Sequence, residues 1–161
     1  MVSFDSTSPL RQAFKDDKDN YYTVDQGNFV ALRVPQVDGN ASVKRLISSG
    51  KLDQASAVRA ERLCLQSLVA FDSSEATVDE VVAALLSYER LLGTSTNHAI
   101  SYRATLESAP WKSCNCGICE RDGIQVAIFR GTERNKRRGF HNLAVFRRRL
   151  AIHLATDTAS C

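Results

Sequence analysis

Three cysteines, Cys114, Cys116 and Cys119, stand within a six-residue stretch and form the densest group of potential metal ligands in the chain. Their C-x-C-x-x-C spacing lets three thiolates converge on one ion, and Gly117 allows the backbone to turn between them. A structural Zn²⁺ ion takes four protein ligands, so a fourth ligand is expected elsewhere in the chain. The sequence therefore predicts a zinc site built around this cysteine knuckle.

Several residues compete for the fourth position. His141, at the start of the predicted last helix, is the best-placed imidazole downstream of the knuckle. His153 and His98 are weaker candidates, and Asp122 lies too close to the knuckle along the chain. Four protein ligands leave no open position for a water molecule, so we expect the Zn²⁺ ion to be structural and not catalytic.

The chain has five cysteines, an odd number that suits metal binding in a reducing compartment better than disulfide formation. Cys64 falls within an apolar helical pattern and is predicted to be a small core residue. No apolar run approaches the roughly 20 residues needed to cross a bilayer, and the N-terminus lacks the blocks of a signal peptide. We therefore expect a cytoplasmic protein with no membrane partner.

The formal net charge of +3 is small, but positive charge is concentrated near the C-terminus. Such a segment suits contacts with nucleic-acid phosphates, although a solvated helix face would give the same pattern. Its position beside a zinc knuckle favours nucleic acid, and it carries no stacking-aromatic signature that would identify DNA or RNA. The cations concerned are Arg134, Lys136, Arg137, Arg138, Arg147 and Arg148.

Hydrophobic spacing divides the chain into an extended N-terminal part, a helical block and a C-terminal part. Short strands are expected at residues 2–5 and 29–34. Apolar residues recur at three- and four-residue spacing from 41 to 107, which predicts helices. A strand at 124–130 and a final helix at 139–155 are expected beyond them.

Helix boundaries inside the block have their own signals. Gly50 and Gly93 follow apolar helical runs and are predicted to be the residues just past two helix ends. Thr77, with Glu80 three positions later, predicts a capping box at a helix start.

The knuckle followed by a distant histidine resembles the zinc motif of the tRNA-guanine (queuine) transglycosylases, whose zinc subdomain interrupts the end of a (β/α)8 barrel. The resemblance strengthens His141 as the fourth ligand. Residues Phe4-Asp5-Ser6-Thr7-Ser8-Pro9-Leu10-Arg11 are similar to the family's Phe-Asp, three variable residues, then Pro-x-Arg. The resemblance implies that Asp5 is the catalytic nucleophile on the last barrel strand and that Arg11 contacts the nucleic acid. Tyr22-Thr23-Val24-Asp25 and the strand after it are similar to the family's β-hairpin.

Two features resemble the branch that inserts 7-deazaguanine bases into DNA: the long helical stretch between Pro35 and Pro110, and the run Arg137-Arg138-Gly139-Phe140-His141-Asn142. DNA is therefore favoured over tRNA as the partner. The implied fold class is α/β: a C-terminal fragment of a (β/α)8 transglycosylase barrel with a large helical insertion and a zinc-binding subdomain. The expected parts are 1–37 (last barrel strand, nucleophile loop and β-hairpin), 38–110 (helical insertion) and 111–161 (zinc-binding subdomain with a basic C-terminal helix).

The implied reaction exchanges guanine for a 7-deazaguanine base through an aspartyl-glycosyl intermediate on Asp5. Active sites of (β/α)8 barrels draw on several strands, and the earlier strands are missing from this chain. We therefore expect the chain to be incomplete alone, with a protein carrying the remainder of the barrel as a candidate partner. Two alternatives stay open: a non-catalytic zinc-dependent nucleic-acid-binding module, and a zinc-stabilised protein-interaction domain.

Overall fold

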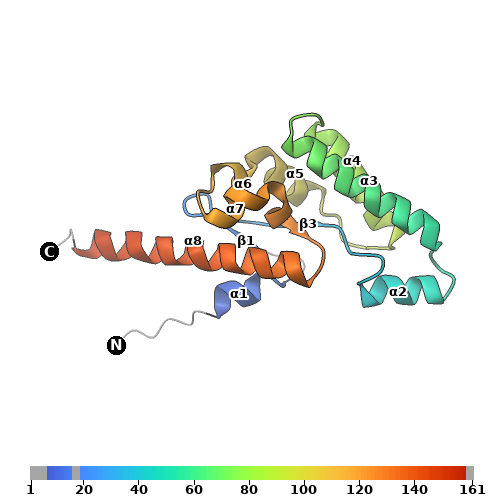
Figure 1. The fold of residues 1–161 in the computed structure, drawn as a ribbon, viewed down its shortest axis with the longest axis horizontal. Helices are drawn as coiled ribbons and strands as arrows, with labels where there is room; N and C mark the ends of the chain where they lie inside the picture. Colours follow the sequence, from blue (N-terminus) through green and yellow to red (C-terminus); the bar gives the residue numbers. More distant parts are fainter. Residues whose placement is uncertain (1–6, 16–18, 159–161) are drawn as a thin grey trace.

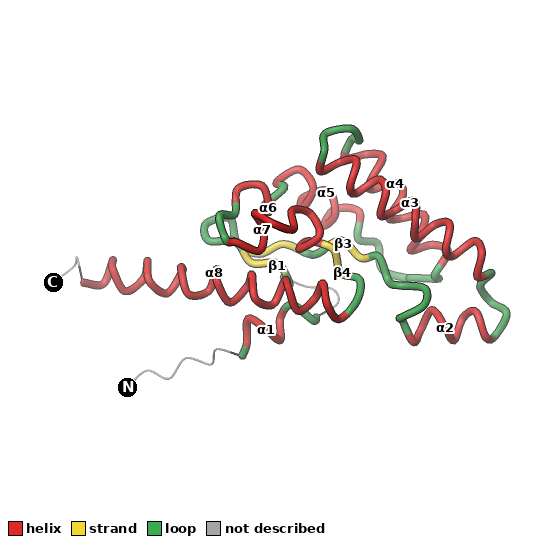
Figure 2. Tube along the Cα trace, viewed as in Figure 1, coloured by secondary structure: helices red, strands yellow, loops and turns green. Residues whose placement is uncertain are grey.

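The computed structural model describes residues 7–15 and 19–158. Most of these residues are helical, as the tube in Figure 2 shows. Helix α8 is the longest element, α1 lies beside it, and α3 and α4 form a helical hairpin at the other end of the molecule (Figure 1). In chain order the elements are α1 (Ser8–Gln12), β1 (Tyr21–Tyr22), β2 (Asn28–Phe29), β3 (Leu32–Arg33), α2 (Ala41–Ser48), α3 (Gln54–Asp72), α4 (Val78–Leu91), α5 (Ala99–Ser108), α6 (Pro110–Ser113), α7 (Gly117–Asp122), the 3₁₀ helix η1 (Gly123–Ala127), β4 (Ile128–Phe129) and α8 (Thr132–Thr158).

The predicted helical block is confirmed as helices α2 to α5. The hydroxyl of Thr77 accepts a hydrogen bond from the Glu80 N–H at 3.3 Å, and the Glu80 carboxylate accepts one from the Thr77 N–H at 2.7 Å. This is the capping box expected at the start of α4. Gly50 and Gly93 follow α2 and α4 with φ angles of 72° and 71°, as predicted for residues just past a helix end.

One apolar cluster joins the helical block to the knuckle. Cys64 of α3 is fully buried within it, as predicted. The Tyr88 hydroxyl of α4 donates to the carbonyl of Pro35 at 2.6 Å, which ties α4 to the segment after β3. Cys116 and Cys119 belong to the same cluster. The packing that holds the helices together therefore also holds the knuckle.

The strand predicted at residues 29–34 is divided between two short strands. β2 pairs antiparallel with β1 to form a hairpin, and β3 pairs parallel with β4. Between them, the Thr105 hydroxyl of α5 donates to the carbonyl of Val30 at 2.8 Å. Between the two sheets, the hydrogen bond to the Val30 carbonyl therefore comes from a helix side chain and not from a neighbouring strand.

The prediction of a single strand at residues 124–130 was wrong, because this segment forms η1 and the two-residue strand β4. The physical reason for this difference is the side chain of Arg138, which donates to the carbonyls of Val126 and Ile128 at 3.3 and 3.0 Å. A buried guanidinium thus satisfies backbone acceptors that a longer sheet would have used.

Helix α8 begins at Thr132, whereas the sequence pattern predicted a basic loop and a helix start at Gly139. One face of the additional turns is packed, since Asn135 and Arg138 are 7% and 0% exposed, while Glu133 and Lys136 on the other face are exposed. The side chains of Asn135 and Arg138 hydrogen-bond to each other at 2.5 Å. Tertiary contacts therefore decide a boundary that the sequence pattern placed about two turns too late.

Within the described residues the fold is mixed and mainly helical, with two two-stranded sheets. Residues 2–5, predicted to form the last barrel strand, lie outside the described residues. The barrel fragment and the three-part division of the chain therefore stay predictions. None of the described helices combines the length and hydrophobicity that crossing a bilayer requires.

Candidate metal centre

Two successive short helices, α6 and α7, and the distant helix α8 bring the four predicted ligands together. Cys114 follows α6, Cys116 is the N-cap of α7, and Cys119 lies in the first turn of α7. The Cys116 sulfur accepts a hydrogen bond from the Cys119 N–H at 3.4 Å, which closes the knuckle. His141 enters from α8 and is fully buried.

The four ligand atoms have the spacing of a tetrahedral site. The Nδ1 atom of His141 lies 3.7 Å from the Cys114 sulfur, 3.4 Å from the Cys116 sulfur and 3.3 Å from the Cys119 sulfur. All four ligand atoms lie within 4.8 Å of one another. Zinc bonds of about 2.3 Å to sulfur and about 2.0 Å to nitrogen place such atoms roughly 3.5 Å apart in a tetrahedron. The group can therefore hold one metal ion, and its donor set is consistent with zinc.

Hydrogen bonds outside the cluster orient the ligands. The Nε2 atom of His141 lies 2.8 Å from the carbonyl oxygen of Tyr22 and donates to it when Nδ1 binds a metal. The ring of Tyr21 stacks on the His141 ring, with centroids 4.3 Å apart. Its hydroxyl lies 3.2 Å from the Cys119 sulfur, and burial raises the pKa of Tyr21 well above its ordinary value. Tyr21 therefore stays protonated and can donate to the Cys119 thiolate.

The electrostatics of the metal-free cluster favour a proton on His141. Burial by itself lowers the pKa of His141, but hydrogen bonds to the sulfurs of Cys114 and Cys116 outweigh it and raise the pKa to about 9. A metal ion must displace this proton from Nδ1 at neutral pH. Cys64 is different, because burial raises the pKa of its thiol to about 12, and among the described residues it belongs to no group of potential metal ligands.

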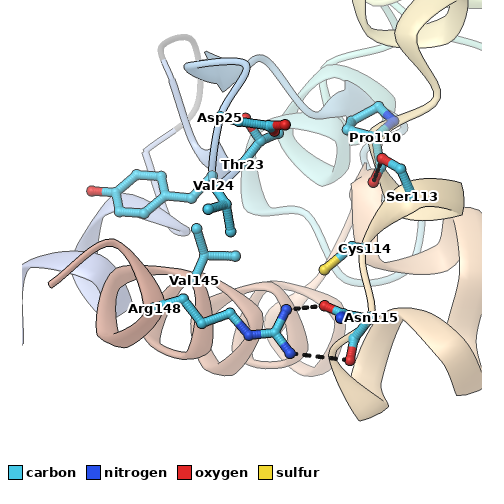
Figure 3. Close-up of a pocket in the computed structure, with 10 residues that line it drawn as sticks. Thr23, Val24, Asp25, Pro110, Ser113, Cys114, Asn115, Val145 and Arg148 are labelled. Carbon is cyan, nitrogen blue, oxygen red and sulfur yellow. Dashed lines mark hydrogen bonds between the residues drawn. The ribbon is translucent and has the colours of Figure 1, made fainter. Parts of the chain in front are cut away.

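A small cavity of about 60 Å³ opens beside Cys114, between the β1–β2 hairpin and the knuckle (Figure 3). Arg148 of α8 crosses its floor and donates to both the side chain and the carbonyl of Asn115. Sites for drug-sized molecules usually measure roughly 300–1,000 Å³. The cavity beside Cys114 lies well below this range.

Residues next to the metal centre were not found from the sequence. Arg149 donates to the carbonyls of Thr23 and Gly27 and stacks over the Tyr22 ring at 5.2 Å, which holds the hairpin against α8. Asn142 and Tyr21 were also missed. The reason is the same for all three residues: no motif spacing identifies partners whose role depends on a contact between distant segments.

The alternative fourth ligands lie elsewhere. His98 is buried with its Nδ1 atom 2.9 Å from the Glu89 carboxylate, and His153 is exposed near Asp157. Asp122 binds the guanidinium of Arg121. Among the described residues, none of these three joins the group formed by the knuckle and His141.

Arg138 was predicted to contact nucleic acid from an exposed basic surface, and this prediction was wrong because its side chain is fully buried. Its guanidinium donates to the carbonyl of Ala13 at 2.7 Å and stacks over the Phe129 ring at 5.2 Å. Burial lowers the pKa of Arg138 to about 9, so it remains charged at neutral pH. Its role is inside the fold.

The other predicted nucleic-acid ligands lie at or near the surface, most with a partner inside the chain. Lys136 pairs with Glu133 at 3.0 Å, and Arg137 lies 3.7 Å from Asp122. Arg134 is half-buried and donates to the side chain of Gln125 at 3.0 and 2.6 Å, and Arg11 of α1 is exposed. Asp5, the predicted nucleophile, lies outside the described residues.

Comparison with known proteins gives one similar protein. No protein-family model matches the chain. The sequence is 44% identical over 158 residues to a DNA-guanine transglycosylase from Salmonella montevideo. The matched region covers 96% of this chain but 38% of the relative, so the chain spans well under half of that protein's length. Over the residues that it shares with this relative, the similarity of the chain supports the transglycosylase family.

Proposed function

We propose that this chain is part of a guanine transglycosylase that replaces guanine by a 7-deazaguanine base in nucleic acid, with DNA favoured over tRNA. The 44% identity to a DNA-guanine transglycosylase is the observation that carries this proposal. Because the chain matches 38% of that relative, we propose that further polypeptide forms the rest of the (β/α)8 barrel and its base-binding pocket. The chain acts in the cytoplasm, where its cysteines remain reduced.

Zn²⁺ is the ion we propose for the metal centre. Three thiolates and one imidazole form a donor set that suits zinc, and four protein ligands complete its coordination. When bound, the ion supplies structural cross-linking between the knuckle and α8. His141, Tyr21 and Tyr22 orient the ligand set, and base exchange takes place elsewhere.

Asp5 is the proposed catalytic residue. Its carboxylate oxygen attacks C1′ of the target nucleotide, the glycosidic bond breaks, and guanine leaves with the bonding electron pair and gains a proton. The ring nitrogen of the 7-deazaguanine base then attacks C1′, loses its proton and displaces the carboxylate. Two inversions retain the configuration at C1′, as in retaining glycosidases.

Contacts to the nucleic-acid backbone are proposed for Arg11, Arg134, Lys136 and Arg137. Of these, Arg11 is the most available, because it is exposed and lies on the helix that follows the Asp5 segment. The ion pair of Lys136 with Glu133 is exposed at both ends, so a phosphate can replace the glutamate at little cost.

The test uses the chain together with a polypeptide that spans the part of the Salmonella montevideo relative that the chain does not match. We expect one zinc per chain, no release of guanine by the chain alone, and release of guanine from DNA by the mixture. Asp5→Ala is expected to abolish release and leave the zinc content unchanged. Exchange that survives in Asp5→Ala would contradict the role of this aspartate.

The match to 38% of the relative also favours a second function, because a chain without the rest of the barrel can act as a zinc-dependent nucleic-acid-binding module. In that case Asp5→Ala leaves the affinity for DNA unchanged, while Arg11→Glu lowers it. A chain with no salt-dependent binding to duplex or single-stranded nucleic acid would instead support a protein-interaction domain.

A further inference from the structure

Helix α1 is held against α8 by two buried side chains. The Arg138 guanidinium donates to the carbonyl of Ala13, the C-cap of α1, at 2.7 Å. The Asn142 amide donates to the carbonyl of Pro9, in the first turn of α1, at 3.3 Å. Both donors are 0% exposed, so water does not compete with these bonds. The two ends of α1 are therefore each fixed by one residue of α8, and Figure 1 shows α1 beside α8.

A glycine lets the two helices approach closely between these bonds. A Cβ atom on Gly139 would lie 3.3 Å from the Leu10 side chain and 3.6 Å from the Leu10 carbonyl oxygen. It would also lie 3.7 Å from the Cβ atom of Ala13. Leu10 therefore packs directly on the backbone of α8, and a larger side chain at position 139 would push α1 away.

The same stretch of α8 supplies the histidine of the metal centre. His141 and Asn142 both bond to Tyr22: Nε2 of His141 lies 2.8 Å from the Tyr22 carbonyl, and the Asn142 oxygen accepts from the Tyr22 N–H at 3.0 Å. The Asn142 amide donates to the carbonyl of Asn20 at 3.0 Å as well. One helix turn thus connects the metal ligand, the hairpin and α1.

Arg138 is costly to bury. The four acceptors that its guanidinium contacts are neutral: three backbone carbonyls and the side chain of Asn135. Its Nε atom has no hydrogen-bond partner among the described residues. A leucine or methionine at this position would fill the space without that cost. What Arg138 supplies is one rigid group that fixes α1, η1 and β4 relative to one another.

We infer that Arg138, Gly139 and Asn142 position α1, and that the docking of α1 is coupled through α8 to metal binding at His141. This rests on the proposed function in one respect: Asp5, the proposed nucleophile, lies four residues before Pro9 in the sequence, so the residues that position α1 act next to the proposed catalytic segment. All three are positioning residues, since each acts through α1 and not on the substrate.

The experiment measures both ends of the coupling on the 161-residue chain loaded with Co²⁺, which reports a thiolate-rich tetrahedral site by its visible spectrum. Amide hydrogen exchange is followed in peptides that cover residues 7–15. Arg138→Met removes the donors to α1, and Gly139→Val removes the close approach while keeping Arg138. Arg137→Met is the matched control, because it removes a neighbouring arginine of α8 that forms an ion pair with Asp122.

We expect Arg138→Met and Gly139→Val to speed exchange in residues 7–15 by at least about fivefold and to weaken Co²⁺ binding by about 5- to 150-fold, the range typical of coupled sites. The shape of the Co²⁺ spectrum is expected to stay the same, because the ligands are unchanged. Arg138→Lys should restore part of the protection, and Arg137→Met should change neither quantity. Removing the metal with a chelator should speed exchange in residues 7–15 of the unsubstituted chain, because coupling between two sites is reciprocal.

The inference is wrong if exchange in residues 7–15 is the same with and without metal, or if neither variant changes it. If Arg138→Met unfolds the whole chain, Gly139→Val decides the question by the same two measurements. The proposed function fails separately, by the absence of base exchange in the reconstituted mixture. Coupling between α1 and the metal centre without base exchange in the mixture would support the positioning of α1 and contradict the transglycosylase assignment.

Discussion

The Nε2 atom of His141 lies 2.8 Å from the backbone carbonyl of Tyr22, and this contact sets which ring nitrogen faces the knuckle. The carbonyl can only accept, so Nε2 carries a hydrogen and Nδ1 is left free to bind a metal. A backbone carbonyl cannot be removed by side-chain substitution, which makes the orientation resistant to mutation. The properties of the metal centre follow from this arrangement.

The first prediction concerns the pH dependence of metal binding. In the metal-free chain the pKa of His141 is raised to about 9, so below this pH a proton must leave Nδ1 before the metal binds. We expect the apparent affinity for Zn²⁺ to fall steadily as the pH is lowered below 9. Competition with a chelator of known pH dependence measures this. An affinity that stays constant between pH 9 and pH 7 would contradict Nδ1 ligation.

The stability of the metal-free chain should show the opposite trend. A histidine whose folded pKa lies above its unfolded value of about 6.5 stabilises the fold at low pH. The contribution of His141 is fully present below about pH 6.5 and is lost as the pH rises through about 9. Urea unfolding of the metal-free chain across this range measures the effect. His141→Gln is expected to flatten the dependence.

The Tyr21 hydroxyl is expected to strengthen metal binding, because it lies 3.2 Å from the Cys119 sulfur and can donate to it. Tyr21→Phe keeps the ring that stacks on His141 but removes the donor. We expect zinc affinity to fall by about 10- to 100-fold, the usual effect of losing a partner of a ligand. Tyr22→Phe is the matched control, since no hydrogen bond to the Tyr22 hydroxyl is found in the described part of the chain. Equal affinity in both variants would exclude this role.

The capping box of α4 should stabilise the helical block independently of the metal. Thr77→Ala removes the hydroxyl that accepts from the Glu80 N–H, and we expect the free energy of unfolding to fall by about 1 kcal/mol. Thr96→Ala, in the exposed loop before α5, is the control. Urea unfolding in the presence of excess zinc compares the two. A loss of similar size in both variants would show that the cap contributes nothing specific.

Nucleic-acid binding is expected to depend on Arg11 more than on the paired cations of α8. Arg11→Gln should weaken DNA binding regardless of sequence and reduce the slope of log affinity against log salt by about one. Arg62→Gln, on the exposed surface of α3, should leave both unchanged. Fluorescence anisotropy over a salt series checks this. An unchanged salt slope in Arg11→Gln would remove Arg11 from the interface.

Short-range chemistry explains which features the sequence alone determined. The spacing of Cys114, Cys116 and Cys119 brings their thiols together in a few residues of chain, and the capping signals at Thr77 and Gly50 act within one helix turn. The helical block and the three cysteine ligands were therefore predictable, because their determining contacts are local.

Contacts between distant segments decided the rest. Nothing in the sequence shows that Arg138 would be buried against Ala13, which lies 125 positions earlier in the chain. This contact and the hydrogen bonds to η1 and β4 place inside the fold a side chain that the sequence predicted at the surface. The choice of Nδ1 on His141 likewise depends on Tyr22, which is 119 positions away. The sequence determined which atoms can bind the metal. The tertiary structure decided their orientation, because buried polar groups must find partners wherever the packed chain provides them.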